Sequence, residues 1–375
     1  MTNIDLPPHG GQLHRIAKSF RVPESELLDF SANINPEGPS ASVIQSLQEA
    51  LHDTTVLSRY PDLEETQLKL SISAYTGIGP ESIIVANGFA PLLDAVLRAL
   101  PIHQCLLPVP AFGEYRNALE RVGVTVAPYL LDQERDFHYQ PGELLRALTA
   151  GQHDAVLLAN PQNPAGVLCD RDSLTRFIED AAGLNVFVLL DEAFIDYAPL
   201  HSLIGETRSH ANLIVFRSVT KFHGIPGLRV AYAAAEPAIA AKIHKRVPPW
   251  AISTLAGIAV RAALMDPAHT NRTLLLNNAR REHLVAEIKA LGFHTYPSAA
   301  NYLLIRFQSI AEAAHYWEEM ILKHRIVLRH CTTFEGLTHN HLRCAVLGDE
   351  QNCRLIQALG DENMAAQHIN PRGFS

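Results

Sequence analysis

The chain has 375 residues, of which 47% are hydrophobic, and it carries a formal net charge of −8 at pH 7. This length allows one large domain with its own core and a smaller second domain. The acidic balance, without any run of basic residues, argues against nucleic acid as a partner. No uncharged apolar stretch approaches the roughly 18 residues of a membrane span, and no signal peptide is expected.

The cysteines and histidines indicate whether the protein lies in a reducing compartment and whether it binds a metal. The five cysteines are scattered and form no C-x-x-C pair, and the 19 histidines include no H-E-x-x-H motif. We therefore expect a reduced, cytoplasmic protein without a metal site.

The chain opens with a proline-containing segment that we expect to form an arm. Residues 1–45 are assigned to this arm and to part of a small domain, and a helix predicted over 42–52 is expected to pack with that small domain. Residues 46–270 are assigned to a large domain and 271–375 to a small C-terminal domain.

Short apolar runs alternate with helical segments through the large domain. Several runs are apolar throughout, which is typical of strands buried on both faces of a mainly parallel sheet. This pattern predicts an α/β fold with helices on both faces of the sheet. The predicted strands are 82–86, 105–107, 124–126, 155–159, 186–190, 213–216 and 230–234, and the predicted helices are 91–100, 112–122, 142–149 and 171–182.

The character of the sequence changes near residue 270. A long charged helix is predicted over 271–291, followed by short strands. This combination predicts a smaller α+β domain. The predicted strands are 294–296, 302–307, 326–329 and 342–346.

Three polar segments directly follow predicted parallel strands. They are Asn-Pro-Gln-Asn-Pro-Ala-Gly at 160–166, Asp-Glu-Ala-Phe at 191–194 and Ser-Val-Thr-Lys at 218–221. The last is followed eight residues later by Arg229. Ligands of open α/β sheets bind at the carboxyl ends of the strands, so these segments are expected to share one site.

These residue types suit the chemistry of pyridoxal 5′-phosphate (PLP). A desolvated Lys221 amine can form a Schiff base with the cofactor aldehyde, and a buried Asp191 carboxylate can keep the ring nitrogen protonated. Ser218 and Arg229 can hold the phosphate, together with backbone N–H groups where a helix begins. The candidates for that helix start and for an aromatic side chain stacked on the ring are Gly88, Phe89, Ala90 and Phe112.

Through these segments the sequence resembles the fold-type I PLP enzymes of the class I/II aminotransferase family, over nearly its whole length. The resemblance implies a large domain with a mainly parallel mixed sheet and a smaller α+β C-terminal domain. It implies that Asn163 bonds the phenolic oxygen of the cofactor and that Arg343 grips the substrate α-carboxylate. It also implies a homodimer in which Tyr60 reaches the partner's cofactor phosphate. Many relatives carry Tyr where this chain has Phe194.

A narrower resemblance is to the threonine O-phosphate decarboxylases of cobalamin biosynthesis, with histidinol-phosphate aminotransferases next. It rests on His-Gly-Gly at 9–11, on Leu-Asp-Phe-Ser-Ala-Asn-Ile-Asn-Pro at 28–36 and on the segment 217–229. The resemblance implies that His9 and Arg329 bind a substrate phosphate. It places Asn35 beside the substrate carboxylate, with Asn163 and Arg343.

The expected reaction is decarboxylation of L-threonine O-3-phosphate to (R)-1-amino-2-propanol O-2-phosphate. Lys221 and Asp191 would serve transamination equally well, because substrate orientation decides which bond breaks. A histidinol-phosphate-type aminotransferase and a serine-phosphate decarboxylase therefore stay open as alternatives. A ligand sensor without catalysis is a third, although Lys221, Asp191 and Arg343 are all retained.

Overall fold

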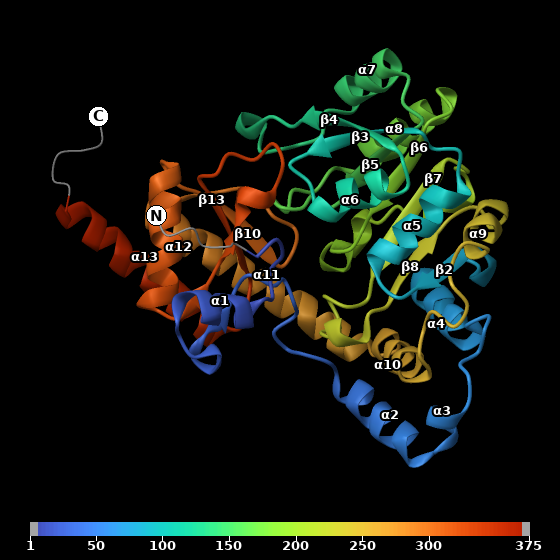
Figure 1. The fold of residues 1–375 in the computed structure, drawn as a ribbon, viewed down its shortest axis with the longest axis horizontal. Coiled ribbons are helices and arrows are strands. Elements are labelled where there is room, and N and C mark those ends of the chain that lie inside the picture. Colours follow the sequence, from blue (N-terminus) through green and yellow to red (C-terminus); the bar gives the residue numbers. More distant parts are fainter. Residues whose placement is uncertain (1–6, 370–375) are drawn as a thin grey trace.

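The apolar runs of the large domain form a seven-stranded sheet with strand order β2-β8-β7-β6-β5-β3-β4. The computed structural model describes residues 7–369 (Figure 1). Strands β3 to β7 are parallel to one another, and β8 is antiparallel to both of its neighbours. All seven strands fall on predicted runs, so the α/β fold is confirmed. The strands are β2 (Ile83–Ala86), β3 (Gln104–Val109), β4 (Thr125–Leu130), β5 (Ala155–Ala159), β6 (Phe187–Asp191), β7 (Leu213–Ser218) and β8 (Ala231–Ala234).

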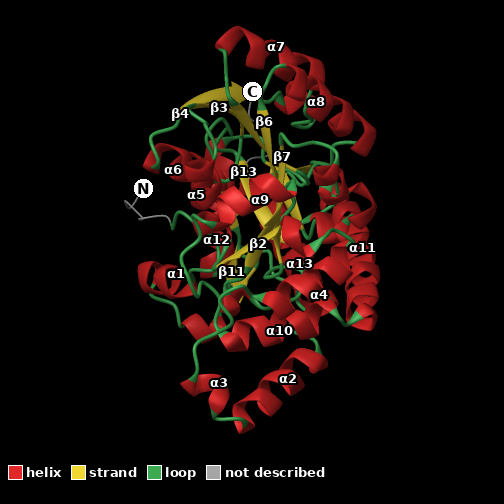
Figure 2. Ribbon diagram, turned by 90° about the vertical axis from the view of Figure 1, so that its right-hand side faces the viewer, coloured by secondary structure: helices red, strands yellow, loops and turns green. Residues whose placement is uncertain are grey.

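Both faces of this sheet are covered by helices (Figure 2). Alternate side chains of each strand point to opposite faces, so Ile84 and Ala86 join one core cluster while Ile83 and Val85 join the other. The apolar character of whole strands follows from this two-sided burial. One face carries α5 (Phe89–Ala99), α6 (Gly113–Arg121) and α9 (Pro237–His244), and the other carries α4 (Thr66–Thr76), α7 (Pro141–Gly151), α8 (Arg171–Gly183) and α10 (Thr254–Leu264).

The helix predicted over 42–52 exists but packs in a different place from the one expected. It is α2 (Ala41–His52), and it lies against α10 with the short α3 (Thr55–Ser58) beside it (Figure 1). Its buried Val43 belongs to the core of the large domain. The assignment of this helix to the small domain is therefore wrong, because its apolar side is buried against a large-domain helix.

The small domain has its own sheet and its own core. The antiparallel sheet has strand order β12-β13-β10-β9, and a two-stranded parallel pair joins β1 to β11. Residues near the N-terminus, such as Ile16 and Phe30, are buried in the same core as Leu303 and Trp317. The elements are α1 (Leu13–Phe20), β1 (Leu28–Asp29), α11 (Pro267–Ala290), β9 (His294–Thr295), β10 (Tyr302–Arg306), α12 (Ile310–Leu322), β11 (Ile326–Val327), β12 (Arg329–His330), β13 (His341–Ala345) and α13 (Asp349–Ile369).

The long helix α11 begins one turn earlier than the sequence predicted. Asp266 caps it by accepting a hydrogen bond from the backbone N–H of His269 at 3.0 Å, and Pro267 occupies the first helical position. Within residues 7–369, no helix combines the length and the apolar composition needed to cross a membrane.

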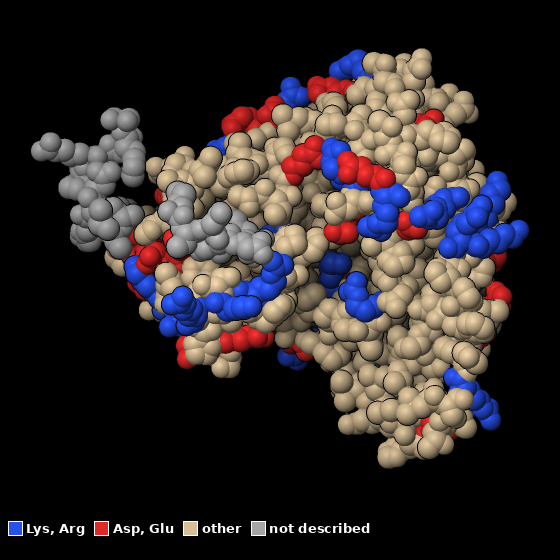
Figure 3. Space-filling view, in the orientation of Figure 1, with Lys and Arg blue, Asp and Glu red and all other residues tan. Residues whose placement is uncertain are grey.

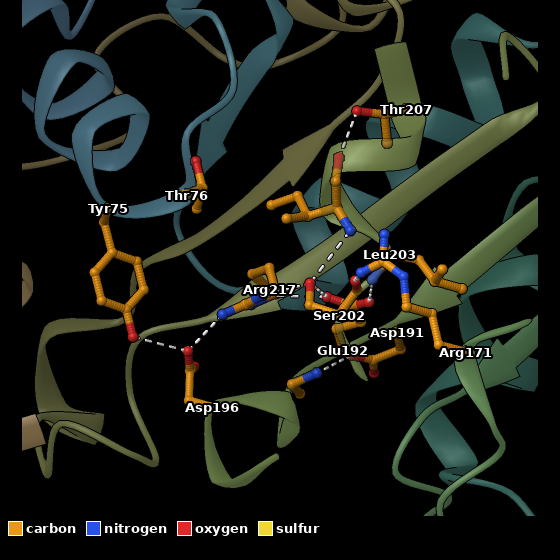
Figure 4. A network of polar contacts seen from close by, with 12 residues as sticks. Tyr75, Thr76, Arg171, Asp191, Glu192, Asp196, Ser202, Leu203, Thr207 and Arg217 are labelled. Carbon is orange, nitrogen blue, oxygen red and sulfur yellow. Dashed lines mark hydrogen bonds and ion pairs between the residues drawn. The ribbon is translucent and has the colours of Figure 1, made fainter. Parts of the chain in front are cut away.

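A buried ionic network joins the loop after β6 to β7 (Figure 4). Arg217 of β7 donates to Glu192 Oε2 at 3.2 Å, to Ser202 Oγ at 3.1 Å and to Asp196 Oδ1. Tyr75 of α4 donates to the same Asp196 oxygen at 3.0 Å. Arg217, Glu192 and Asp196 are at most 5% exposed. The network therefore fixes the backbone that directly follows Asp191.

Removal of Arg217 should destabilise the protein strongly. An Arg217→Met variant leaves two carboxylates buried without their cation, which typically costs about 3–5 kcal/mol of unfolding free energy. Urea denaturation measures this loss. Arg116→Met is the matched control, because Arg116 pairs with the half-exposed Glu335 at the surface and should cost no more than about 1 kcal/mol. Equal losses in the two variants would show that the network does not stabilise the fold.

Candidate active site

Three neighbouring parallel strands deliver polar side chains to one edge of the large sheet. Asp191 is the last residue of β6, and its Cα pairs with Ala159 of β5 and Phe216 of β7. Because the three strands run in the same direction, the segments that leave them meet at this edge. The structure thus brings together Asn163, Asp191 and Lys221, which line one cavity.

Asp191 is buried and held by two hydrogen bonds. Its Oδ2 accepts from the Tyr115 hydroxyl at 2.5 Å, and its Oδ1 accepts from the backbone N–H of Ala193 at 2.8 Å. Burial raises the pKa of Asp191, while the bond from Tyr115 and the nearby charge of Lys221 act in the opposite direction. A cation placed against this carboxylate would favour its ionised form.

Tyr115 is a site residue that the sequence analysis missed. Its ring packs edge-on against Phe112 at 5.6 Å between centroids, and burial raises its pKa well above the ordinary value. The available signal was the spacing, since residues three apart lie on the same side of a helix. Phe112 immediately precedes α6 and Tyr115 lies in its first turn.

The Lys221 amine lies in a largely apolar setting. Its Nζ is 3.5 Å from Ser218 Oγ and 5.2 Å from the ring centre of Phe194. Burial lowers the pKa of Lys221; Asp191 opposes this shift, and the charges of Arg229 and Arg343 add to it. A lowered pKa leaves more of the amine uncharged at neutral pH, which makes it a better nucleophile.

A small cavity of about 50 Å³ surrounds this amine and the Asp191 carboxylate. Its walls are mainly aromatic and apolar, as a planar heterocycle requires. The lining residues are Phe89, Phe112, Tyr115, Ala159, Pro161, Asn163, Asp191, Ala193, Phe194 and Lys221.

The start of α5 provides a cradle for a phosphate. Gly88 precedes the helix with a φ of +92°, and a Cβ there would lie 3.1 Å from Nη2 of Arg229. Phe89 and Ala90 are the first two helical residues, whose N–H groups have no partner within a helix. Ser218 Oγ lies 2.8 Å from the Thr220 hydroxyl. The lysine, the buried carboxylate and this cradle together fit PLP.

A second cavity of about 190 Å³ opens beside Lys221, between the two domains. Figure 3 shows a hollow between the two lobes with lysine and arginine atoms inside it. Charged and polar side chains from both domains and from the N-terminal segment face this cavity. The lining residues are Pro8, His9, Gly10, Ser31, Ala32, Asn33, Ile34, Phe112, Gly113, Asn163, Phe194, Lys221, Arg329, Thr333, Phe334 and Arg343.

Arg343 of β13 joins the small domain to the cofactor pocket. It donates to Asn163 Oδ1 at 2.6 Å, and its guanidinium carbon lies 5.0 Å from the ring centre of Tyr302. Its Nε is buried without a hydrogen-bond partner among the described residues. Burial lowers the pKa of Arg343. An anion in the cavity would supply the missing partner.

Arg329 faces the same cavity but is held by its own chain. It donates to the carbonyls of Pro8 at 2.5 Å, Pro7 at 3.3 Å and His330 at 2.7 Å, and to Thr333 Oγ1 at 2.6 Å. Burial lowers the pKa of Arg329 to about 10, so the guanidinium stays charged at neutral pH. A substrate phosphate that binds the Nη atoms must replace one of these oxygens.

The structure does not place Asn35 beside the substrate carboxylate. Its amide donates to the Phe222 carbonyl at 2.8 Å and to Thr273 Oγ1 at 3.0 Å, and its oxygen accepts from the N–H of Glu37. Asn33, two residues earlier, lines the cavity instead, and its Oδ1 is buried without a partner among residues 7–369. The two asparagines leave the chain in different directions, which sequence alone could not resolve.

Tyr60 lies outside the cavities that surround Lys221. Its side chain is 82% exposed and stacks on Trp250 at 4.9 Å between ring centroids. A single chain therefore does not bring Tyr60 to its own site.

The fold and this site define a PLP-dependent enzyme of the aminotransferase type. The family model "Aminotransferase class I and II" matches residues 25–359. The chain therefore belongs to the class I and II aminotransferase family, and PLP is its cofactor.

Relatives named for different activities are similar to this chain to nearly the same degree. The chain is 32% identical to a threonine-phosphate decarboxylase of Salmonella typhimurium over 356 residues, which is 94% of this chain and 95% of that protein. It is 30% identical to the bifunctional adenosylcobalamin biosynthesis protein CobDQ of Leptospira interrogans, covering 96% of this chain but only 41% of that longer protein. A solved histidinol-phosphate aminotransferase from Clostridium acetobutylicum superposes with a TM-score of 0.83 and 28% identity, covering 90% of this chain and all of that one.

Replacement of the candidate lysine should abolish covalent cofactor binding. In Lys221→Ala, we expect purified protein mixed with PLP to lack the visible absorption band of a lysine-bound cofactor, since the reactive amine is gone. The control is Lys242→Ala, which removes an exposed lysine of α9 and should keep the band. A persistent band in Lys221→Ala would disprove the assignment of Lys221.

The two asparagines should give opposite phenotypes. Asn33→Ala should leave stability nearly unchanged and weaken binding of an amino-acid ligand about tenfold, as expected for one lost hydrogen bond to a charged group. Asn35→Ala should instead cost about 1–3 kcal/mol of stability, because the buried Phe222 carbonyl loses its donor. Urea denaturation and ligand titration of the cofactor band measure the two effects. The reverse pattern would restore Asn35 as the ligand-binding residue.

Proposed function

We propose that the protein decarboxylates L-threonine O-3-phosphate to (R)-1-amino-2-propanol O-2-phosphate, the linker of the cobalamin nucleotide loop. The observation that carries this proposal is that Arg329 and Arg343 face one cavity together with Lys221. Two cations beside one amine suit an amino acid with a carboxylate and a second anionic group a few bonds away.

The cavity also contains an aromatic side chain that lies beside both arginines. Phe334 lies between the arginines, with its ring centre 5.4 Å from the Arg329 guanidinium carbon and 5.7 Å from that of Arg343. The 32% identity to a threonine-phosphate decarboxylase supports the proposed reaction.

Each residue has a proposed task in this reaction. Arg343 and Asn163, joined by their 2.6 Å hydrogen bond, orient the amino-acid carboxylate, and Asn33 offers a further polar atom. Arg329 and His9 receive the phosphate. Bound PLP would supply the electron sink for the bond that breaks at the α-carbon. Asp191 holds the proton on the ring nitrogen, and Lys221 returns a proton to the α-carbon after carbon dioxide has left.

A homodimer forms part of this proposal. Tyr60 is exposed on a face that also exposes Leu57 at 68% and Trp250 at 47%. Such apolar side chains at one surface suit contact with another protein chain. In the proposed dimer, Tyr60 reaches the cofactor phosphate of the partner.

A histidinol-phosphate-type aminotransferase is the second candidate. It is favoured by the 28% identity and the TM-score of 0.83 with the Clostridium acetobutylicum enzyme. Serine phosphate is also open as a substrate of the decarboxylase, because one methyl group contributes only about 1–3 kcal/mol of discrimination.

One assay separates these activities. The holoenzyme is incubated with L-threonine O-phosphate, with and without 2-oxoglutarate. We expect carbon dioxide and aminopropanol phosphate in both cases, because decarboxylation consumes no keto acid. Replacing threonine phosphate by serine phosphate compares kcat/KM for the two substrates. Turnover of histidinol phosphate that depends on 2-oxoglutarate, without carbon dioxide release from threonine phosphate, would overturn the proposal in favour of the aminotransferase.

A further inference from the structure

The N-terminal segment lies across the mouth of the substrate cavity and is held from the small domain. The Pro7 and Pro8 carbonyls accept hydrogen bonds from Arg329, and the N–H of Gly11 donates to Ser31 Oγ at 2.9 Å. At Gly10 the backbone approaches so closely that a Cβ would lie 2.0 Å from the Ser31 carbonyl oxygen. These contacts fix the backbone of the segment but not the direction of the His9 side chain.

The His9 side chain is held from the large domain instead. Its Nε2 lies 3.1 Å from Glu114 Oε1, and its ring centre lies 5.8 Å from that of Phe112. Glu114 stands in the first turn of α6, and the same oxygen accepts a hydrogen bond from Asn117 Nδ2 at 3.0 Å. The carboxylate is therefore already oriented by its own helix when it meets the imidazole.

We infer that Glu114 is a positioning residue that orients His9 for recognition of a phosphate ester. The inference rests on the proposed function in one respect, which is that the substrate carries a phosphate group. An ionised carboxylate can only accept a hydrogen bond, so Nε2 must carry the proton in this contact. Nδ1 is then the ring nitrogen that faces the ligand, and it donates to a phosphate oxygen when the ring carries both protons. Glu114 thus sets the ring orientation of His9, and its negative charge offsets the positive charge of the doubly protonated ring.

Glu114 can also act against phosphate binding, and this second effect determines how the inference is tested. A carboxylate near a phosphate site also repels the bound dianion, and its side chain is 24% exposed, so solvent weakens but does not remove this repulsion. If positioning dominates, removal of the charge weakens phosphate recognition. If repulsion dominates, the same removal strengthens it. The sign of the change distinguishes the two.

The measurement is the preference for a phosphorylated ligand. Stopped-flow titration of the visible cofactor band of the holoenzyme, read before the first turnover, gives an apparent Kd for O-phospho-L-threonine and for L-threonine. The ratio of the two values isolates the phosphate contribution. In Glu114→Gln we expect this preference to fall roughly five- to twentyfold, because a neutral amide oxygen accepts the Nε2 hydrogen bond more weakly than a carboxylate does, with the L-threonine Kd unchanged. In a His9→Ala background, Glu114→Gln should have no further effect.

Glu335→Gln is the matched control. Glu335 and Glu114 line the same cavity, which shares His9 and Phe112 with the substrate cavity, but Glu335 pairs with Arg116 at 2.8 Å and not with His9. The Glu335→Gln substitution removes the same charge and should leave the preference for the phosphorylated ligand unchanged. Any one of three results would overturn the inference. They are an unchanged or increased preference in Glu114→Gln, an equal fall in Glu335→Gln, and an additive effect of Glu114→Gln in the His9→Ala background.

Failure of the proposed function would be visible separately. If O-phospho-L-threonine binds without release of carbon dioxide, the decarboxylase proposal fails while the preference ratio still decides the role of Glu114. Calorimetric titration of the wild-type protein and its four variants with inorganic phosphate asks the same question without any amino acid. A wild-type protein with no preference for the phosphorylated ligand and no phosphate binding would contradict the inference.

Discussion

The site depends on one constraint, which is that β5, β6 and β7 are hydrogen-bonded neighbours running in the same direction. Their carboxyl ends must therefore reach the same edge of the sheet, and the chain leaves each strand with a polar side chain. Asn163, Asp191 and Lys221 are separated by tens of residues in the sequence, yet they line one cavity. The buried Arg217 network reinforces this constraint, because it ties the backbone after Asp191 to β7.

Charge and burial at that edge work together. Burial raises the pKa of Asp191 and lowers that of Lys221, and each group opposes the other's shift by its own charge. A cofactor with a protonated ring nitrogen and an aldehyde satisfies both groups at once. The apolar walls that cause these shifts, among them Phe112 and Phe194, are also the walls that suit a flat ring.

The residues that we propose to select the substrate come from a different part of the molecule. Arg329 and Arg343 come from adjacent strands of the small domain, and His9 comes from the N-terminal segment. These residues meet the catalytic lysine only because the two domains close around one cavity. In the proposed reaction, the lysine and the carboxylate of the large domain would serve decarboxylation and transamination alike, and the residues from the small domain and the N-terminal segment would orient the substrate.

The sequence by itself determined the strands, the PLP chemistry and the family, because these depend on local patterns. Apolar runs mark two-sided burial, and Lys221, Asp191 and Arg229 stand at fixed spacings after strands. Only the tertiary structure showed that Asn33 lines the cavity while the amide of Asn35 is held by Phe222 and Thr273, since both asparagines lie in one loop and packing sets their directions. It also placed α2 on the large domain and brought Glu114 to His9, 105 residues away. Such contacts join segments that are distant in the chain, and no local pattern encodes them.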